Sequence, residues 1–283
     1  MTQKDPHVSW TDEQWARVQQ VIQQEASRAR VAATFLPLVG SLPPGTDFVR
    51  KEAVSYAQGQ IHIDDKSTVQ LATLQVKVPL RGAQVADPDM TSALTLFRRA
   101  ANVLARLEDA VVFRGIVKKG NRFTIDGDLK PEIWEIRAYE IARGLFDANS
   151  PPVHIGANTG EALVTAVSTA IANLEGQGHF GPFAVVLGQD LFLLAQTPAP
   201  SLALPQDRII PFLAGGSLLR SSVLPPKGGV VVALGGAPVE LVIAKDVTLD
   251  FLQQTEEGDY LFRVLEKLVL RVKEPEAIVR LER

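Results

Sequence analysis

Three glycines, Gly176, Gly178 and Gly181, satisfy the G-x-G-x-x-G spacing that cradles the pyrophosphate of a dinucleotide. In dinucleotide-binding folds these glycines leave a strand and open a helix, because the helix N-terminus holds the anion. Here a helical pattern, residues 159–174, precedes the glycines and an apolar strand, residues 184–187, follows them. We therefore expect an ordinary helix-to-strand connection and no nucleotide site.

Residue types that bind metals or attack carbonyl groups are too scattered in the sequence to form a site. None of the four histidines has a second histidine at the i, i+4 spacing that places two metal ligands on one helix face. The chain has no cysteine, so thiolate nucleophiles and disulfides are excluded. No G-x-S-x-G motif is present, which argues against a serine hydrolase. The sequence predicts no catalytic residue and no metal.

Two adjacent carboxylates, Glu108 and Asp109, stand within the longest helical pattern. Neighbouring side chains on a helix point about 100° apart, which is poor geometry for two carboxylates that share a substrate. We expect both to form salt bridges with arginines.

Composition narrows the class of protein. The 283 residues are 46% hydrophobic and carry a net charge of -3, so the chain can bury a large core and has no general basic field for nucleic acid. No apolar run reaches the ~20 residues of a membrane helix, and the N-terminus lacks a signal-peptide core. We expect a cytosolic protein that binds neither nucleic acid nor membrane.

The adjacent carboxylates Glu108 and Asp109 lie in a long helix predicted at residues 91–114, a stretch that contains no glycine or proline. Its apolar residues follow three- and four-residue steps in two neighbouring rows. We expect burial on more than one side. The rows are Leu94, Phe97, Ala101, Leu104 and Val111, and beside them Leu96, Val103 and Leu107.

Further helices are predicted at residues 9–30, 130–146 and 159–174. Ser9 or Thr11 is the expected N-cap of the first, and a threonine also precedes the last. Residues 33–39 contain a proline and are expected to be extended.

Strand patterns fill two parts of the chain. Residues 41–84 alternate apolar and polar side chains at Ile61 and Ile63 and again from Leu71 to Val78, which predicts a hairpin arm. The arm has too few large apolar residues for a core of its own, so it should pack on another subunit. In the last third, strands are expected at 229–234, 239–243, 247–251, 260–272 and 277–281.

Several stretches resemble the encapsulin shell proteins, bacterial nanocompartment proteins related to the capsids of HK97-type phages. The similarity is clearest in GQGHFGPFAVVLGQDLF (176–192), LEDAVVFRG (107–115) and FRVLEKLVLRVKEPEAIVRL (262–281). Order and spacing agree over nearly the whole chain, and the length matches the short type that lacks an inserted nucleotide domain.

The resemblance implies an α+β, HK97 phage-capsid-like fold with a P-domain, an A-domain and an extended E-loop. The long helix becomes the spine of the P-domain, and the arm becomes the E-loop that embraces a neighbour. The implied divisions are 1–45 for the N-terminal helix and arm, 46–84 for the E-loop, 85–129 for the spine helix, 130–234 for the A-domain, and 235–283 for the P-domain sheet and C-terminus.

The resemblance also implies a groove on the inner face of the shell that binds a short cargo peptide. Ala33 and Pro37 stand where a basic and an acidic residue are expected, so the peptide should be more apolar here. The alternative is that the groove positions are core residues of the fold. These positions are Phe35, Leu38, Val39, Leu249, Phe251 and Ile278.

A proline-rich loop corresponds to the five-fold pore of the family. It carries no charge, so the implied pore would not select ions by fixed charge. Leu80 stands near the position where some encapsulins hold a flavin through tryptophan, so no cofactor is predicted. The loop residues are Thr197, Pro198, Ala199, Pro200, Ser201, Leu202, Ala203, Leu204 and Pro205.

The resemblance thus implies a non-enzymatic icosahedral shell of about 60 or more copies that encloses a cargo enzyme through a targeting peptide. A ferritin-like protein or a dye-decolourising peroxidase is the expected cargo, which gives the shell a role in iron storage or oxidative stress. Two alternatives stay open. A phage capsid protein is disfavoured because Glu25 accompanies Arg28 on the inner helix, where DNA would require a basic stripe. A small soluble enzyme is disfavoured by the absence of a catalytic cluster.

Overall fold

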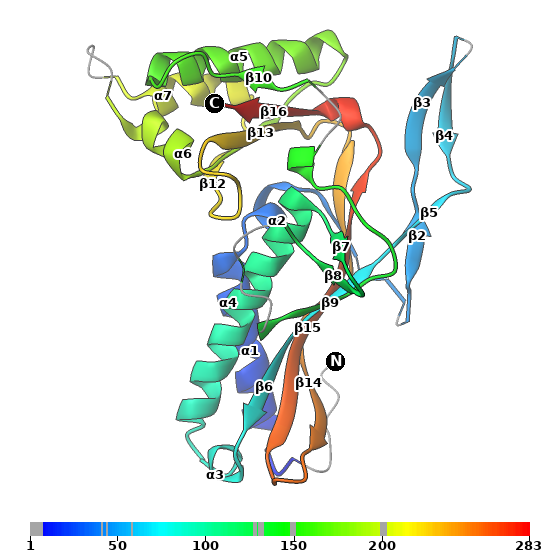
Figure 1. Cartoon of the computed structure of the whole chain (residues 1–283), viewed down its shortest axis with the longest axis vertical. Helices are drawn as coiled ribbons and strands as arrows, with labels where there is room; N and C mark the ends of the chain where they lie inside the picture. The colour runs from blue at the N-terminus through cyan, green and yellow to red at the C-terminus, as the bar shows by residue number, and fades with distance from the viewer. Residues whose placement is uncertain are drawn as a thin grey trace.

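The computed structural model describes residues 8–40, 42–43, 45–57, 59–126, 129, 133–147, 151–198 and 203–283. These residues form two bodies, each built on one sheet, and a narrow arm that projects to one side (Figure 1). A layer of buried apolar side chains fills each body. Among the described residues, none of the helices has the length and hydropathy needed to cross a bilayer.

The larger body is built on a seven-stranded sheet, in the order β1-β14-β15-β6-β9-β8-β7. β14 and β15 form its long antiparallel centre, as the alternating pattern from residue 260 to 272 predicts, and β6 pairs antiparallel with β15. The strands are β1 (Leu38–Val39), β6 (Ala72–Leu80), β7 (Val117–Lys119), β8 (Arg122–Thr124), β9 (Glu135–Arg137), β14 (Val239–Gln254) and β15 (Tyr260–Val272).

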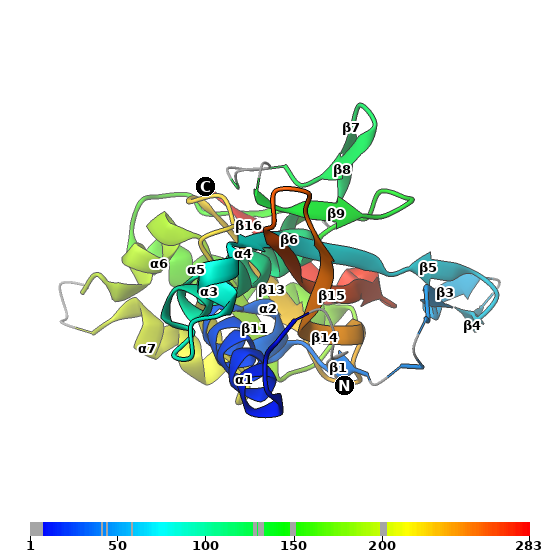
Figure 2. The same ribbon diagram turned by 90° about the horizontal axis from the view of Figure 1, so that it is seen from below.

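Two helices pack on this sheet, α1 (Asp12–Ala29) against β14 and α4 (Thr91–Arg114) against β6 and β15. The bounds of α4 are those predicted, and both of its apolar rows are buried except for Leu96. α1 begins after Thr11, whose hydroxyl accepts a hydrogen bond from the backbone of Gln14. In Figure 2, α1 and the β7–β8 hairpin lie on opposite sides of the body.

The smaller body is built on a five-stranded sheet, in the order β10-β16-β13-β11-β12. Alternate residues of β13 face opposite ways: Val231 packs under the helices, whereas Val232 faces the core of the larger body. The elements are β10 (Val153–His154), α5 (Gly160–Gly176), β11 (Phe183–Leu187), α6 (Gln189–Gln196), α7 (Pro205–Ile209), η3 (Ile210–Leu213), β12 (Leu218–Arg220), β13 (Gly228–Ala233) and β16 (Ile278–Glu282).

The arm consists of two short strand pairs, β2–β5 at its root and β3–β4 beyond it (Figure 1). In the outer pair, Tyr56 stands opposite Ile61 and Val54 opposite Ile63, so one face of the ribbon is apolar. Tyr56, Ile61 and Ile63 are each more than half exposed. The strands are β2 (Phe48–Arg50), β3 (Ala53–Ala57), β4 (Gln60–Asp64) and β5 (Thr68–Gln70).

Residues 72–80 differ from the prediction, because they form a central strand and not part of the arm. β6 lies between β15 and β9 in the large sheet, and Leu74, Val76 and Val78 are buried against the helices. The alternation of residues predicts a strand correctly. It does not identify the sheet to which the strand belongs, because that depends on residues far away in sequence.

The helix predicted at residues 130–146 is wrong for the residues that the structure describes there. Trp134 and Ile136 are buried, whereas Glu135 between them is half-buried and Arg137 after them is exposed. Burial therefore alternates with the period of two that is typical of a strand, here β9. Among the described residues of this range, Ile133 and η2 (Leu145–Asp147) have 3-10 helical conformation, and none is α-helical. The extended stretch predicted at 33–39 is correct only at its end, because α2 (Ala32–Phe35) precedes β1. Two further short helices are α3 (Gly82–Val85) and η4 (Pro275–Ala277).

Candidate functional site

Three of the predicted groove residues lie together where the chain passes from α2 to β1, a segment we call the α2–β1 turn (residues 35–39). The ring of Phe35 stacks on that of Phe113 in α4, with centroids 6.3 Å apart. Leu38 stands opposite Leu241 of β14, and 55% of its surface is exposed. Val39 follows it and is half-buried. The turn therefore presents a small apolar surface, which is held in place by the packing of Phe35 on Phe113 and by the pairing of Leu38 with Leu241.

The other three predicted groove residues are not brought to this turn. Phe251 stands opposite Phe262 towards the other end of β14, ten residues and about 30 Å of strand from the position of Leu241. Leu249 and Ile278 are fully buried in the core of the larger body. A peptide on the surface could not reach them, so these two positions follow the alternative expectation of core residues.

The proline-rich loop connects α6 to α7 at the end of the smaller body. Thr197, Pro198 and Ala203 are exposed, and Pro205 is buried as the first residue of α7. Residues 199–202 lie outside the described residues.

Backbone hydrogen bonds to one side chain hold the start of α2 against the spine helix α4. Asp109 accepts hydrogen bonds from the backbone N–H groups of Val31, at 2.9 Å, and Ala32, at 2.8 Å. These N–H groups belong to the first turn of a helix and have no partner within it. Asp109 is therefore the cap that positions the α2–β1 turn.

Beside this cap, four elements meet at a single guanidinium group. Arg30, at the end of α1, brings its Nη1 atom to 3.6 Å from Glu108 of α4 and 3.5 Å from Glu266 of β15. Its Nη2 atom lies 3.3 Å from Asp246 of β14. Asp246 is more than half exposed, whereas the side chains of Glu108 and Glu266 have no exposed surface. We call Arg30, Glu108, Asp109, Asp246 and Glu266 the buried charge cluster.

The electrostatics of the cluster are dominated by burial. Desolvation, with the nearby Glu266, raises the pKa of Glu108 well above its usual range. Desolvation also raises the pKa of Glu266 to about 7 and that of Asp109 to about 7, despite Arg30 and the backbone donors. For Arg30, desolvation would lower the pKa, but the surrounding carboxylates raise it above its usual value. The arginine stays charged, and burial moves the release of protons from these carboxyls up towards neutral pH.

Prediction from sequence found part of this cluster. Glu108 does form an ion pair with an arginine, as expected, whereas Asp109 caps a helix and makes no ion pair among the contacts described. Arg30 and Glu266 were not anticipated. The sequence pattern that could have identified Glu266 as buried is the alternation within β15, which places it on the same inward face as Phe262, Val264 and Leu268.

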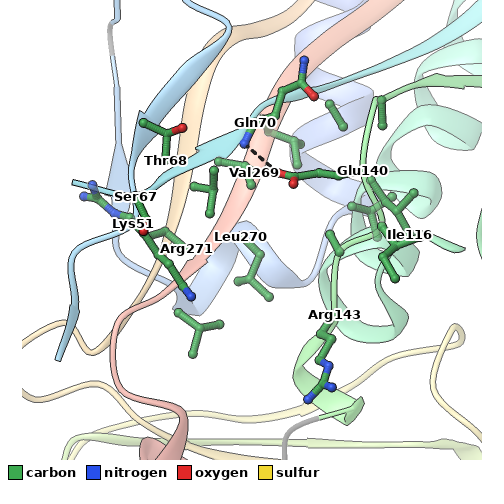
Figure 3. Close-up of a pocket in the computed structure, with 18 residues that line it drawn as sticks. Lys51, Ser67, Thr68, Gln70, Ile116, Glu140, Arg143, Val269, Leu270 and Arg271 are labelled. Atoms are coloured by element: carbon green, nitrogen blue, oxygen red, sulfur yellow. Dashed lines mark hydrogen bonds between the residues drawn. The ribbon is translucent and has the colours of Figure 1, made fainter. Parts of the chain in front are cut away.

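A hollow of about 410 Å³ lies at the root of the arm, between β5, β15 and the segment after β9 (Figure 3). Its apolar lining includes Ile116 and Leu270, and Lys51 and Arg143 stand at its rim. The backbone N–H of Gln70 donates to Glu140 across one side, which ties the arm root to that segment.

Comparison with known families and proteins gives a consistent match. A family model described as an encapsulating protein for peroxidase (Linocin_M18) matches residues 137–269. The type 1 encapsulin shell protein EncA of Myxococcus xanthus is 28% identical over 289 residues, which cover 96% of this chain and 93% of the relative.

Solved structures agree with the fold. The virus-like particle from Pyrococcus furiosus superposes with a TM-score of 0.70 at 15% identity, covering 96% of this chain and 100% of that one. The SrpI encapsulin of Synechococcus elongatus superposes with a TM-score of 0.57 at 11% identity, covering 88% and 85%. At such identities the likeness establishes a capsid-like fold.

Proposed function

We propose that this chain, which is similar to encapsulin shell proteins and has an HK97-type capsid fold, is a member of that family and forms a closed icosahedral shell of about 60 or more copies around a cargo protein. Self-assembly into a shell is the function of this family, and its role is structural. Copy number, cargo and the inner binding surface are our proposals. We also place the shell in the bacterial cytoplasm and assign it no catalytic role.

The single observation that supports assembly most strongly is the exposed apolar face of the arm. Tyr56 and Ile61 are each 72% exposed, on a two-stranded ribbon that extends away from both bodies. An isolated two-stranded ribbon is only marginally stable in water, and a contiguous apolar face on it marks a contact surface. A neighbouring copy of the chain supplies the missing partner in a shell.

For cargo, we propose that a short apolar peptide binds at the α2–β1 turn, around the exposed Leu38. Support comes from the apolar surface of the turn and from the description of the family as encapsulating a peroxidase. A peroxidase or a ferritin-like enzyme with a targeting tail is the proposed cargo. Leu249 and Ile278 are excluded from the contact surface, because both are buried.

We further propose that residues 197–205 line a neutral opening at the five-fold axes. The sequence of this loop contains no charged side chain, and Thr197 and Pro198 face solvent. Such an opening would pass small neutral molecules and ions alike.

Assembly is tested by measuring the mass of the purified chain by light scattering, followed by negative-stain imaging of the same peak. Each chain has a mass of 30.7 kDa, so 60 copies would weigh about 1.8 MDa. Round particles at or above that mass are the expected result. A monodisperse monomer or dimer would refute the proposed shell.

The cargo surface is tested with the variant Leu38→Asp. The probe is a fluorescent protein that carries the C-terminal tail of the enzyme co-purifying with the shell. We expect loading of the probe to fall at least about tenfold, since a charge replaces an apolar contact, while the shells stay intact. Leu252→Asp is the matched control, because Leu252 is also exposed, on β14 but away from the turn. Equal loss in both variants, or in neither, would remove the α2–β1 turn from the cargo site.

A further inference from the structure

The buried charge cluster contains more carboxyl groups than its single cation can neutralise. One guanidinium faces Glu108 and Glu266 directly, and Asp109 and Asp246 complete the charged groups on the elements packed around it. Within the part of the chain that the structure describes, the four oxygens of Glu108 and Glu266 accept no hydrogen bond from any N–H group. Two ionised carboxylates in this place would be poorly compensated.

A shared proton resolves this imbalance. With one proton held between Glu108 and Glu266, the pair carries a single negative charge, which matches the positive charge of Arg30. Both carboxyls meet the same Nη1 atom of Arg30, so their charges are coupled through it. Loss of the shared proton leaves two buried negative charges facing one positive charge.

The segment that depends on this cluster is the one that begins at Arg30 and continues into the α2–β1 turn. Arg30 joins α1 to α2, and the backbone N–H groups of the next two residues donate to Asp109. The side-chain anchor of residues 31 and 32 therefore lies in the cluster, whereas residues 37–39 are held separately by β14, through the pairing of β1 and the hydrogen bond from the N–H of Leu241 to the carbonyl of Pro37. A change in the charge of the cluster acts directly on residues 31–36 and reaches the rest of the α2–β1 turn through them.

We propose that the buried charge cluster is a proton-controlled clasp, which holds residues 31–36 against the spine helix while Glu108 and Glu266 share a proton and loosens them when that proton leaves. The consequence for cargo rests on the proposed function: because the turn at residues 35–39 is the proposed peptide surface, cargo would be held most firmly in acid and released most readily in alkali.

The direction of the pH effect follows from the raised pKa values. Burial raises the pKa of Glu266 to about 7, and that of Glu108 is raised as well, so the folded chain keeps protons that the unfolded chain would release. The stabilising contribution is complete below the ordinary glutamate pKa of about 4.5 and is lost as the pH rises through about 7. Clasp opening is expected between pH 6 and pH 8.5.

Hydrogen–deuterium exchange of assembled shells tests the clasp without any cargo. We expect the protection of backbone amides in residues 31–36 to fall at least about tenfold from pH 6 to pH 8.5, since one pKa unit corresponds to a factor of ten. Protection of the buried strand β11 should stay constant and corrects for the intrinsic pH dependence of exchange. Unchanged protection of residues 31–36 in the unmodified chain overturns the clasp.

Two variants separate the clasp from a general effect of pH. Glu266→Gln keeps the shape of the side chain and removes the shared proton, so the fall in protection of residues 31–36 between pH 6 and pH 8.5 should disappear. Ionisation of Asp109 over the same range can only strengthen its hydrogen bonds to these residues. Glu240→Gln is the matched control, since Glu240 is a buried glutamate in the same sheet whose burial is overcome by Lys273 and Arg271, which lower its pKa. Retention of the pH response in Glu266→Gln contradicts the proposal. If Glu266→Gln does not assemble, Glu108→Gln serves the same test.

Cargo loading distinguishes failure of the clasp from failure of the proposed peptide surface. If both the clasp and the proposed peptide surface are correct, the tail-fused fluorescent protein should load about tenfold less at pH 8.5 than at pH 6. If hydrogen exchange of residues 31–36 depends on pH but cargo loading does not, the clasp is supported and the α2–β1 turn is not the peptide-binding surface. Loading and exchange that both ignore pH would overturn the clasp.

Discussion

The Oδ1 atom of Asp109, near the C-terminal end of the spine helix, accepts a hydrogen bond of 2.8 Å from the backbone N–H of Ala32, 77 residues earlier in the chain. This contact joins the N-terminal segment to the core of the larger body. Replacement by alanine would leave the buried N–H of Ala32 without its partner, at a cost of about 1–3 kcal/mol, and would also remove the partner of the half-buried N–H of Val31. We expect Asp109→Ala to lower the thermal midpoint by about 5 °C or more.

The matched variants for this contact are Asp109→Asn and Asp89→Ala. Asparagine keeps an oxygen acceptor and should restore much of the loss. Asp89 is exposed, so its replacement should change stability by less than about 0.5 kcal/mol. An Asp109→Ala protein as stable as the parent would show that the cap contributes nothing to folding.

A second prediction concerns Phe262, which is fully buried at the end of the larger body. Its ring stacks on Trp10 with centroids 5.0 Å apart and meets Phe97 edge to face at 5.6 Å. Phe262→Ala should cost about 3–5 kcal/mol in the free energy of unfolding, because the cavity cannot be filled by its rigid aromatic neighbours. Leu252→Ala, on an exposed side chain, is the control for denaturant titrations.

The junction after the spine helix gives a third prediction. Gly115 has φ +77°, and a Cβ atom there would lie 2.1 Å from the carbonyl oxygen of Ala142. Gly115→Ala should therefore prevent correct folding, seen as loss of soluble shells on expression. Gly120 also has a positive φ, of +61°, but its Cβ position is open. Shells from Gly120→Ala should form, and equal yields from both variants would contradict the steric argument.

The pH dependence of overall stability is a fourth prediction. The raised pKa of Glu266, about 7, means that folded chains bind more protons than unfolded chains between pH 4.5 and 7. Stability must therefore decline as the pH rises across this interval, by about 3 kcal/mol if Glu266 acts alone. In Glu266→Gln the decline should be smaller, and the variant should match or exceed the parent at pH 8. Thermal melts at pH 5, 6, 7 and 8 measure both effects.

A fifth prediction addresses the arm. Ile61→Asp places a charge on the apolar face of the β3–β4 ribbon, where burial against a neighbouring copy would cost several kcal/mol per contact. We expect chains that are folded by circular dichroism but sediment as small species. Gln60→Asp adds the same charge one residue away, on the other face of the ribbon, and should assemble normally. Full-size shells from Ile61→Asp would exclude this face from the contacts between copies.

Elements with a strong internal period could be predicted from the sequence. Residues 91–114 form a helix with the predicted bounds, and the alternating residues 260–272 form one long strand. In both, the pattern of apolar side chains extends over many turns or pairs, so local burial is enough to define the element. The short range from Ile133 to Ile141 misled the prediction, because its few apolar residues fit either period.

Local sequence determined the type of most elements, and several stretches of it carry the resemblance to encapsulin shell proteins. The tertiary structure decided which elements meet. It placed β6 in the central sheet, buried Leu249 and Ile278 where a groove was expected, and brought Glu266 to Arg30 across more than 230 residues of chain. Such contacts depend on long-range pairing and burial, which no periodicity within one segment records.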